Sequence, residues 1–188
     1  MKTEVKKESV VAYVLRLALT LLIITSVVAA ALAGVNSITA PVIAASNAAK
    51  TQQAVEAVLP GGGELVDVPA VDAGAPVSEV YKGENGYAVQ VAPAGFDGEI
   101  DMMVGIDNEG KVTAISIINH TETAGLGAVA AASTSAGEAF RNEFVGLSGE
   151  VAVSKDDGKA DTISGATITS RAVAAGVNAA LSVAKAMG

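Results

Sequence analysis

The chain of 188 residues has no cysteine and only one histidine, His120. It therefore cannot form a disulfide, a thiolate zinc site or a cysteine-ligated iron–sulfur cluster. A single histidine also excludes bis-histidine haem and metal sites that need two histidines. If this protein handles electrons, its redox group must be supplied from outside the polypeptide.

Basic residues are scarce after the first 35 positions, where 18 acidic and 8 basic residues remain, a net charge of −10. No basic stripe is left to bind nucleic acid, so no nucleic-acid partner is expected. An acidic surface also avoids anionic lipid head groups. We therefore expect the part of the chain that follows residue 35 to stand beside a membrane and not to lie on it.

A long uncharged run, Leu17–Val35, has 19 residues and is long enough to span a bilayer as a helix. The sequence predicts a tail at 1–9 and a transmembrane helix at 10–35. Basic residues precede the run and none follows it until Lys50, which places the N-terminus in the cytoplasm and the rest outside. A cleaved signal peptide ending at Ala31-Leu32-Ala33 is the alternative.

Residues 36–63 are predicted to form a helical connector, and residues 64–188 a single domain. The spacing of apolar residues between Ala45 and Leu59 indicates a second helix, which Pro60-Gly61-Gly62-Gly63 would end. Pro41 lies near the start of the Ala-rich stretch at 36–59, ahead of this pattern.

The domain has strand-like runs followed by helices. Two hairpins are predicted, Val77–Lys82 with Tyr87–Ala92 and Ile100–Asp107 with Lys111–Asn119. Short helices are expected at 128–132 and 138–145, a loose charged segment at 148–160 and a last helix from about Thr169 to Ala186. This order predicts an α+β fold with antiparallel strands.

The most informative motif is Asp161–Ser170, DTISGATITS, directly before an apolar helical stripe. Gly165-Ala166 leaves the backbone accessible to a ligand. The free N–H groups and the dipole of the helix start favour an anion beside the Thr167 hydroxyl. The alternative is that these hydroxyl residues only cap the helix.

This motif resembles the flavinylation sequence D-x-x-(S/T)-G-A-(S/T)-x-(S/T) of the FMN-binding domains in the Rnf and Nqr respiratory complexes. In that family a flavin transferase joins FMN through its phosphate to the last residue of S-G-A-T, which here is Thr167. The resemblance implies that Ser164, Gly165, Ala166 and Thr169 surround this phosphate and that Asp161 belongs to the signal read by the transferase. Ser164 and Thr169 could equally cap the helix.

A second motif, His120–Gly127, resembles the H-x-E-T-P-G-L-G loop that lies against the flavin in relatives, with Ala124 in place of proline. The resemblance implies contacts to FMN from Glu122, Thr123, Gly125, Leu126 and Gly127. Gly125–Ala130 also reads as a dinucleotide fingerprint, but no βαβ unit surrounds it. His120 either donates a proton to reduced flavin or is only structural, and Phe96 is expected in the core.

The order of motifs and the single anchor are most similar to the G-subunit family of the Rnf complex. The resemblance implies a single-pass protein of the bacterial cytoplasmic membrane that relays electrons in a ferredoxin:NAD⁺ oxidoreductase coupled to ion transport. Alone it should have no substrate turnover. Its partners would be the membrane, other subunits and, during maturation, the transferase. The alternatives are the C subunit of a sodium-pumping NADH:quinone reductase, an anchored binding module without flavin, and a secreted hydrolase.

Overall fold

The computed structural model describes residues 10–71 and 73–188, so the predicted tail at 1–9 lies outside the described residues. The chain divides into two compact units, Met1–Ala48 and Ala49–Gly188. Helix α1 (Val10–Val58) supplies the described part of the first unit, and its last turns belong to the second.

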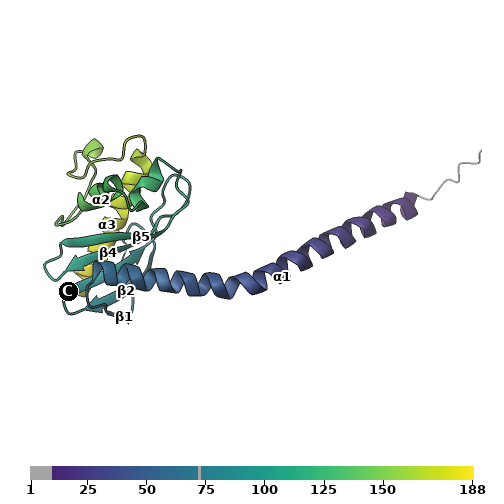
Figure 1. Cartoon of the computed structure of the whole chain (residues 1–188), viewed down its shortest axis with the longest axis horizontal. Coiled ribbons are helices and arrows are strands. Elements are labelled where there is room, and N and C mark those ends of the chain that lie inside the picture. The colour runs from purple at the N-terminus through teal and green to yellow at the C-terminus, as the bar shows by residue number, and fades with distance from the viewer. Residues whose placement is uncertain (1–9, 72) are drawn as a thin grey trace, which may run out of the picture. The chain divides into compact units, whose positions relative to one another are not determined.

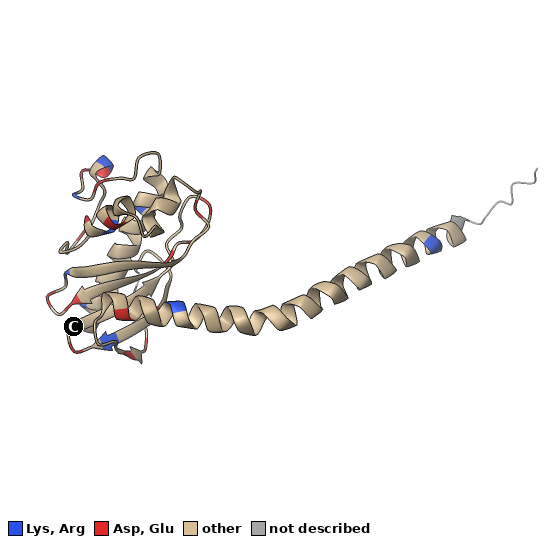
Figure 2. Ribbon diagram, in the orientation of Figure 1, with Lys and Arg blue, Asp and Glu red and all other residues tan. Residues whose placement is uncertain are grey.

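In the first unit, α1 exposes apolar side chains on all sides. Four of its hydroxyl side chains, those of Thr20, Thr25, Ser37 and Thr39, donate to carbonyl oxygens three or four residues earlier in the helix. Figure 2 shows the long stretch of α1 without charged residues. Within the described part of the chain, α1 is the one helix long and apolar enough to cross a membrane.

The sequence predicted two helices here, and the structure joins them into one of 49 residues that contains Pro41. Proline removes one backbone hydrogen bond and clashes with the carbonyl one turn earlier, but it need not end a helix whose neighbouring turns are intact. The predicted stop is close to the observed one, since α1 ends at Val58, just before Pro60.

The second unit contains one antiparallel sheet with its strands in chain order. The strands are β1 (Glu64–Val66), β2 (Val77–Gly83), β3 (Gly86–Val91), β4 (Asp101–Asp107) and β5 (Val112–Asn119). Both predicted hairpins are confirmed, β2 with β3 and β4 with β5. The acidic segment after the glycines adds a short edge strand, β1.

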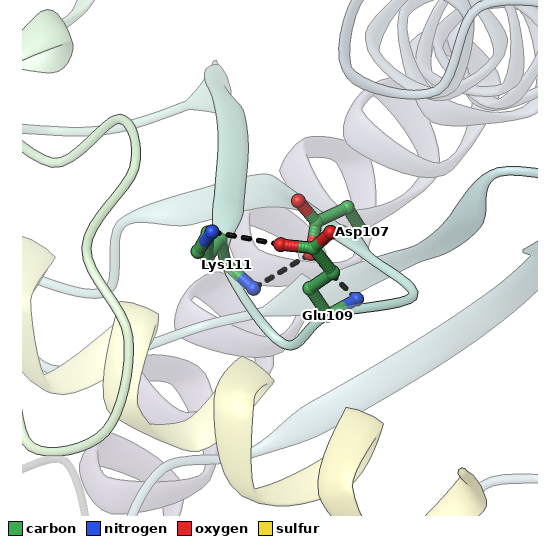
Figure 3. Close-up of polar contacts among 3 residues, drawn as sticks. All are labelled: Asp107, Glu109 and Lys111. Carbon is green, nitrogen blue, oxygen red and sulfur yellow. Dashed lines mark hydrogen bonds and ion pairs between the residues drawn. The ribbon is translucent and has the colours of Figure 1, made fainter.

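Two turns show why these hairpins form where they do. Gly86 begins β3 with φ +147°, and a Cβ there would collide with the Ile106 carbonyl on β4. In the turn after β4, the Asp107 carboxylate accepts hydrogen bonds from the backbone N–H groups of Glu109 and Lys111, as Figure 3 shows. The Lys111 ammonium lies 2.7 Å from the Glu109 carboxylate and is exposed.

The sheet has a helix on each face (Figure 1). Val80, Val89, Val104 and Ile115 lie in register across four strands and belong to the core cluster that buries α3 (Thr167–Met187). The opposite face carries Ala88 and Met103, which pack against Ala54, Val55 and Val58 of α1. The predicted apolar stripe of the last helix is confirmed, because its five residues are all buried: Val173, Val177, Ala180, Leu181 and Ala184.

Three shorter helical segments complete the α+β fold that the sequence predicted: η1 (Gly127–Ala131), α2 (Ser135–Asn142) and η2 (Ser154–Asp156). The expectation that residues 148–160 are loose is wrong. Val153 and Ala160 are buried and bridge one another, and the Ser154 N–H donates to the Ala160 carbonyl over 2.7 Å. Apolar residues within this charged segment fix its backbone against the core.

Candidate functional site

A cavity of about 340 Å³ lies where the start of α3 meets three loops. These are the loop after β3, the loop after β5 and the loop that carries η2. Its size falls at the lower end of the range for small-molecule sites. The cavity is lined by Phe96, Glu122, Thr123, Leu126, Gly127, Lys155, Gly165, Ala166, Thr167, Ile168 and Thr169.

Both sequence motifs therefore meet in one place, although 33 residues separate them in the chain. Of the ten predicted site residues, eight line the cavity, and Ser164 and Gly125 do not. Ser164 is exposed on the turn before α3. Gly125 has φ +76° and open space where a Cβ would be, so it serves the path of its loop.

The start of α3 has no side-chain cap. Ala166 occupies the cap position, and neither Ser164 nor Thr169 bonds to the first turn. The alternative that Ser164 or Thr169 caps the helix is therefore not what the structure shows. The first-turn N–H groups remain available, and the helix dipole makes this end of α3 favourable for an anion.

Thr167 is the first residue of α3 and is partly buried. Its hydroxyl oxygen accepts a hydrogen bond from the Lys155 ammonium over 3.1 Å. Lys155 is the cationic side chain among the cavity-lining residues. Arg171, one turn further along α3, instead holds the Asp156 carboxylate with two contacts of 2.6 Å.

Glu122 joins its own loop, which follows β5, to the loop after β3 and to the start of α3. One carboxylate oxygen accepts a 2.5 Å hydrogen bond from the Thr169 hydroxyl on α3. The other accepts from the backbone N–H groups of Phe96 and Asp97, over 2.7 and 3.2 Å. The side chain is only 8% exposed, so its charge depends on these donors.

These contacts set the ionisation of Glu122. Burial raises the pKa of this carboxyl, but the hydrogen bonds that it accepts from Thr169, Asp97 and Phe96 act in the opposite direction. The balance lowers the pKa below its ordinary value of 4.5. Glu122 is therefore an anion at neutral pH with its acceptor sites largely occupied. That arrangement suits a group that holds loops together better than one that transfers protons.

Two glycines make room for Glu122. A Cβ on Gly127 would collide with the Glu122 carboxylate and the Thr169 hydroxyl, and a Cβ on Gly95 would collide with the other carboxylate oxygen. The resemblance implied a contact between Gly127 and FMN. The structure shows that its missing side chain is required by the protein's own hydrogen bonds.

Phe96 corrects another prediction. It is 65% exposed and lies on the cavity rim, whereas the sequence placed it in the core. Glycines on either side of Phe96-Asp97 were the signal that the pair forms the tip of a turn. Leu126 and Ile168, 44% and 50% exposed, give the rim further apolar surface.

His120 does not line the cavity. Its Nδ1 accepts a hydrogen bond from the Glu122 N–H over 3.2 Å, which shapes the loop after β5. This geometry matches the structural alternative for His120.

Two cavity-lining residues, Lys155 and Ile168, were not predicted from the sequence. Lys155 lies in the segment 148–160, which was expected to be loose, and Ile168 occupies a variable position of the motif.

A larger groove of about 1060 Å³ lies beside the turn after β4 and the end of α3. Three side-chain carboxylates line it, from Asp107, Glu109 and Glu150, against one cationic side chain, Lys185. Negative charge there disfavours an anionic ligand. In the smaller cavity the Lys155 ammonium and the start of α3 both lie beside the Thr167 hydroxyl, and that combination suits a phosphate.

Comparison with known proteins agrees with this assignment. Residues 95–182 match the FMN-binding domain family, and this range includes every cavity-lining residue. The chain is 35% identical to the G subunit of the Na⁺-translocating ferredoxin:NAD⁺ oxidoreductase complex of Acetobacterium woodii, over 90% of this chain and 91% of that protein. It is 31% identical to the G subunit of an ion-translocating oxidoreductase complex of Methanosarcina acetivorans, over 86% of this chain and 89% of that protein.

Fold, FMN-binding domain and similarity along nearly the whole length lead to one assignment: the chain belongs to the family of G subunits of Rnf-type ion-translocating oxidoreductase complexes.

Proposed function

We propose that this chain carries FMN covalently, as a phosphoester of Thr167, and relays electrons between other subunits of its complex. The observation that carries the proposal is the place of the Thr167 hydroxyl. It lines the cavity at the uncapped start of α3, within hydrogen-bond distance of the Lys155 ammonium.

The residues present fit FMN in both of its parts. A phosphate attached to Thr167 would lie beside Lys155 and the first-turn N–H groups, both of which favour negative charge. Phe96, Leu126 and Ile168 would hold the flat ring between apolar surfaces. Thr123 and the loop backbone would bind the polar edge of the ring and tune its electronics.

When bound, FMN supplies one- and two-electron redox chemistry, which this cysteine-free chain lacks. The protein would hold the flavin, orient it and keep part of it accessible at the open rim. A covalent bond maintains a high local concentration of the cofactor whatever the affinity of the cavity. Electron transfer would then depend on neighbouring subunits, and the isolated chain would turn over no substrate.

The membrane-facing part of the proposal rests on the charge distribution around α1. Residues 10–35 would be retained as an anchor with the N-terminus in the cytoplasm, and residues 36–63 would connect it to an extracytoplasmic FMN domain at 64–188. The compact unit begins earlier, at Ala49, because the last turns of α1 pack on the sheet. Small residues would let the anchor approach other membrane helices closely, namely Ala29, Ala30, Ala31, Ala33 and Gly34.

Intact mass spectrometry tests the attachment and the retention of the anchor together. The full chain, produced with a flavin transferase, should gain the mass of one FMN less one water, and its denatured band should fluoresce under ultraviolet light. Thr167→Val should remove both signals while the domain remains folded. Thr162→Val is the matched control, because Thr162 is also partly buried but occupies a variable position of the motif. Flavin retained in Thr167→Val would refute the assignment.

A further inference from the structure

We infer that Lys155 is the positioning residue that binds the phosphate carried by Thr167. The inference rests on the proposed function and extends it to a residue outside the Asp161–Ser170 motif. In the flavin-free protein the Lys155 ammonium donates to the Thr167 hydroxyl oxygen over 3.1 Å. A phosphoester formed at that oxygen keeps one negative charge, and its free oxygens fall within reach of the same ammonium.

Of the described charged side chains near Thr167, Lys155 is the one whose charge is not already paired with another residue. Arg171 is nearby on α3, but two of its nitrogens bind the Asp156 carboxylate, and that pair is internally neutral. Glu122 adds a negative charge to the cavity, but its oxygens accept hydrogen bonds from Thr169, Phe96 and Asp97. Among the residues that the structure describes, no carboxylate lies within 4.0 Å of the Lys155 ammonium, so its charge is available to an anion.

The backbone around Lys155 is held in place although its side chain is exposed. Val153 and Ala160 are 1% and 0% exposed and anchor the segment in the core. The Asp156–Arg171 pair ties η2 directly to α3, one residue after Lys155. A flexible lysine side chain is therefore attached to a fixed point near the helix start, which lowers the entropic cost of keeping its ammonium at Thr167.

The test compares three variants of the full chain, each produced with the transferase. Lys155→Met removes the charge, Lys155→Arg retains it, and Lys159→Met removes an equal charge from the same segment. Lys159 does not line the cavity. Two quantities are measured: the fraction of chains carrying the FMN mass at fixed times after transferase induction, and the ³¹P resonance of the loaded protein in detergent.

We expect Lys155→Met to load about fivefold more slowly, the effect of losing an exposed ion pair. Its ³¹P resonance should move away from the wild-type position, which loss of transferase recognition alone would not cause. Lys155→Arg should restore both values, and Lys159→Met should match wild type. Complete loss of loading in Lys155→Met, restored in Lys155→Arg, also supports the inference.

The inference is overturned if Lys155→Met loads at the rate of Lys159→Met with an unchanged ³¹P resonance, or if Lys155→Arg fails to restore loading. Failure of the proposed function looks different, because wild type itself would then gain no FMN mass and show no ³¹P signal from a phosphoester.

Discussion

The hydrogen bond between Thr169 and Glu122 gives a prediction that does not require the flavin. Thr169→Val removes the hydroxyl that donates to a buried carboxylate and keeps a side chain of similar shape. Hydrogen bonds to charged groups contribute roughly 1.5–3 kcal/mol. We therefore expect the free energy of unfolding to fall by about 2 kcal/mol at pH 7.

The effect should depend on pH in a defined direction. The pKa of Glu122 is lowered in the folded protein, so its ionised form stabilises the fold above the ordinary pKa of 4.5. That contribution is lost as the pH falls below 4.5 and through the lowered pKa. Once Glu122 is protonated, Thr169→Val removes only a hydrogen bond between neutral groups. The resulting fall in the free energy of unfolding should therefore shrink to about 1 kcal/mol.

The assay is urea unfolding of the flavin-free full chain in detergent, at pH 7 and at steps down to pH 3. Tyrosine fluorescence follows the domain, because Tyr87 is buried in its core. Ser182→Ala is the control, since it removes an exposed hydroxyl from the same helix, and its effect should stay within about 0.5 kcal/mol. A Thr169→Val cost below that limit at pH 7, or one that does not change with pH, would refute the role assigned to Glu122.

Three further predictions follow from the same geometry. Gly127→Ala should destabilise the flavin-free protein by about 1–3 kcal/mol in the same urea assay, because the added methyl collides with Glu122 and Thr169; wild-type stability would show that this wall yields easily. Phe96→Ala should change the free energy of unfolding by less than about 0.5 kcal/mol, since the phenyl ring is exposed. If this phenyl ring contacts the flavin, the same substitution should raise the fluorescence yield of the loaded flavin, and an unchanged yield would count against the contact. Because the chain has no cysteine, single cysteine substitutions can report its orientation in the membrane. A membrane-impermeant maleimide should label Ser148→Cys in intact cells, whereas it should label Thr3→Cys only after the cells are lysed. The reverse pattern would contradict an extracytoplasmic domain.

Local patterns were sufficient for most of the secondary structure. The two hairpins follow from apolar runs that flank Glu84-Asn85-Gly86 and the turn at Asp107–Gly110, and both formed as predicted. The last helix follows from an apolar stripe with helical spacing, and all five residues of that stripe are buried. Errors arose where tertiary contacts override local composition. The segment at 148–160 is rich in charge, but a few buried apolar residues anchor it.

The site could be predicted only as two motifs with separate implications. Resemblance pointed to Thr167 and to the loop after β5, and both line the cavity. Phe96 was misassigned because an aromatic residue is more often buried than exposed, and Lys155 could not be chosen from the eight basic residues that follow position 35. Ser164 belongs to the motif by sequence but lies outside the cavity, since the turn before α3 directs it to solvent.

The sequence by itself determined an apolar segment long enough for a bilayer and antiparallel strands followed by helices. It also excluded thiolate, iron–sulfur and bis-histidine centres, because the chain has no cysteine and one histidine. These properties depend on composition and on neighbours a few positions apart. Only the tertiary structure decided which distant groups meet, namely Lys155 with Thr167 and Glu122 with Thr169 and the turn at Phe96. Such contacts depend on how the sheet positions α3 against three loops, and no short-range pattern encodes that arrangement.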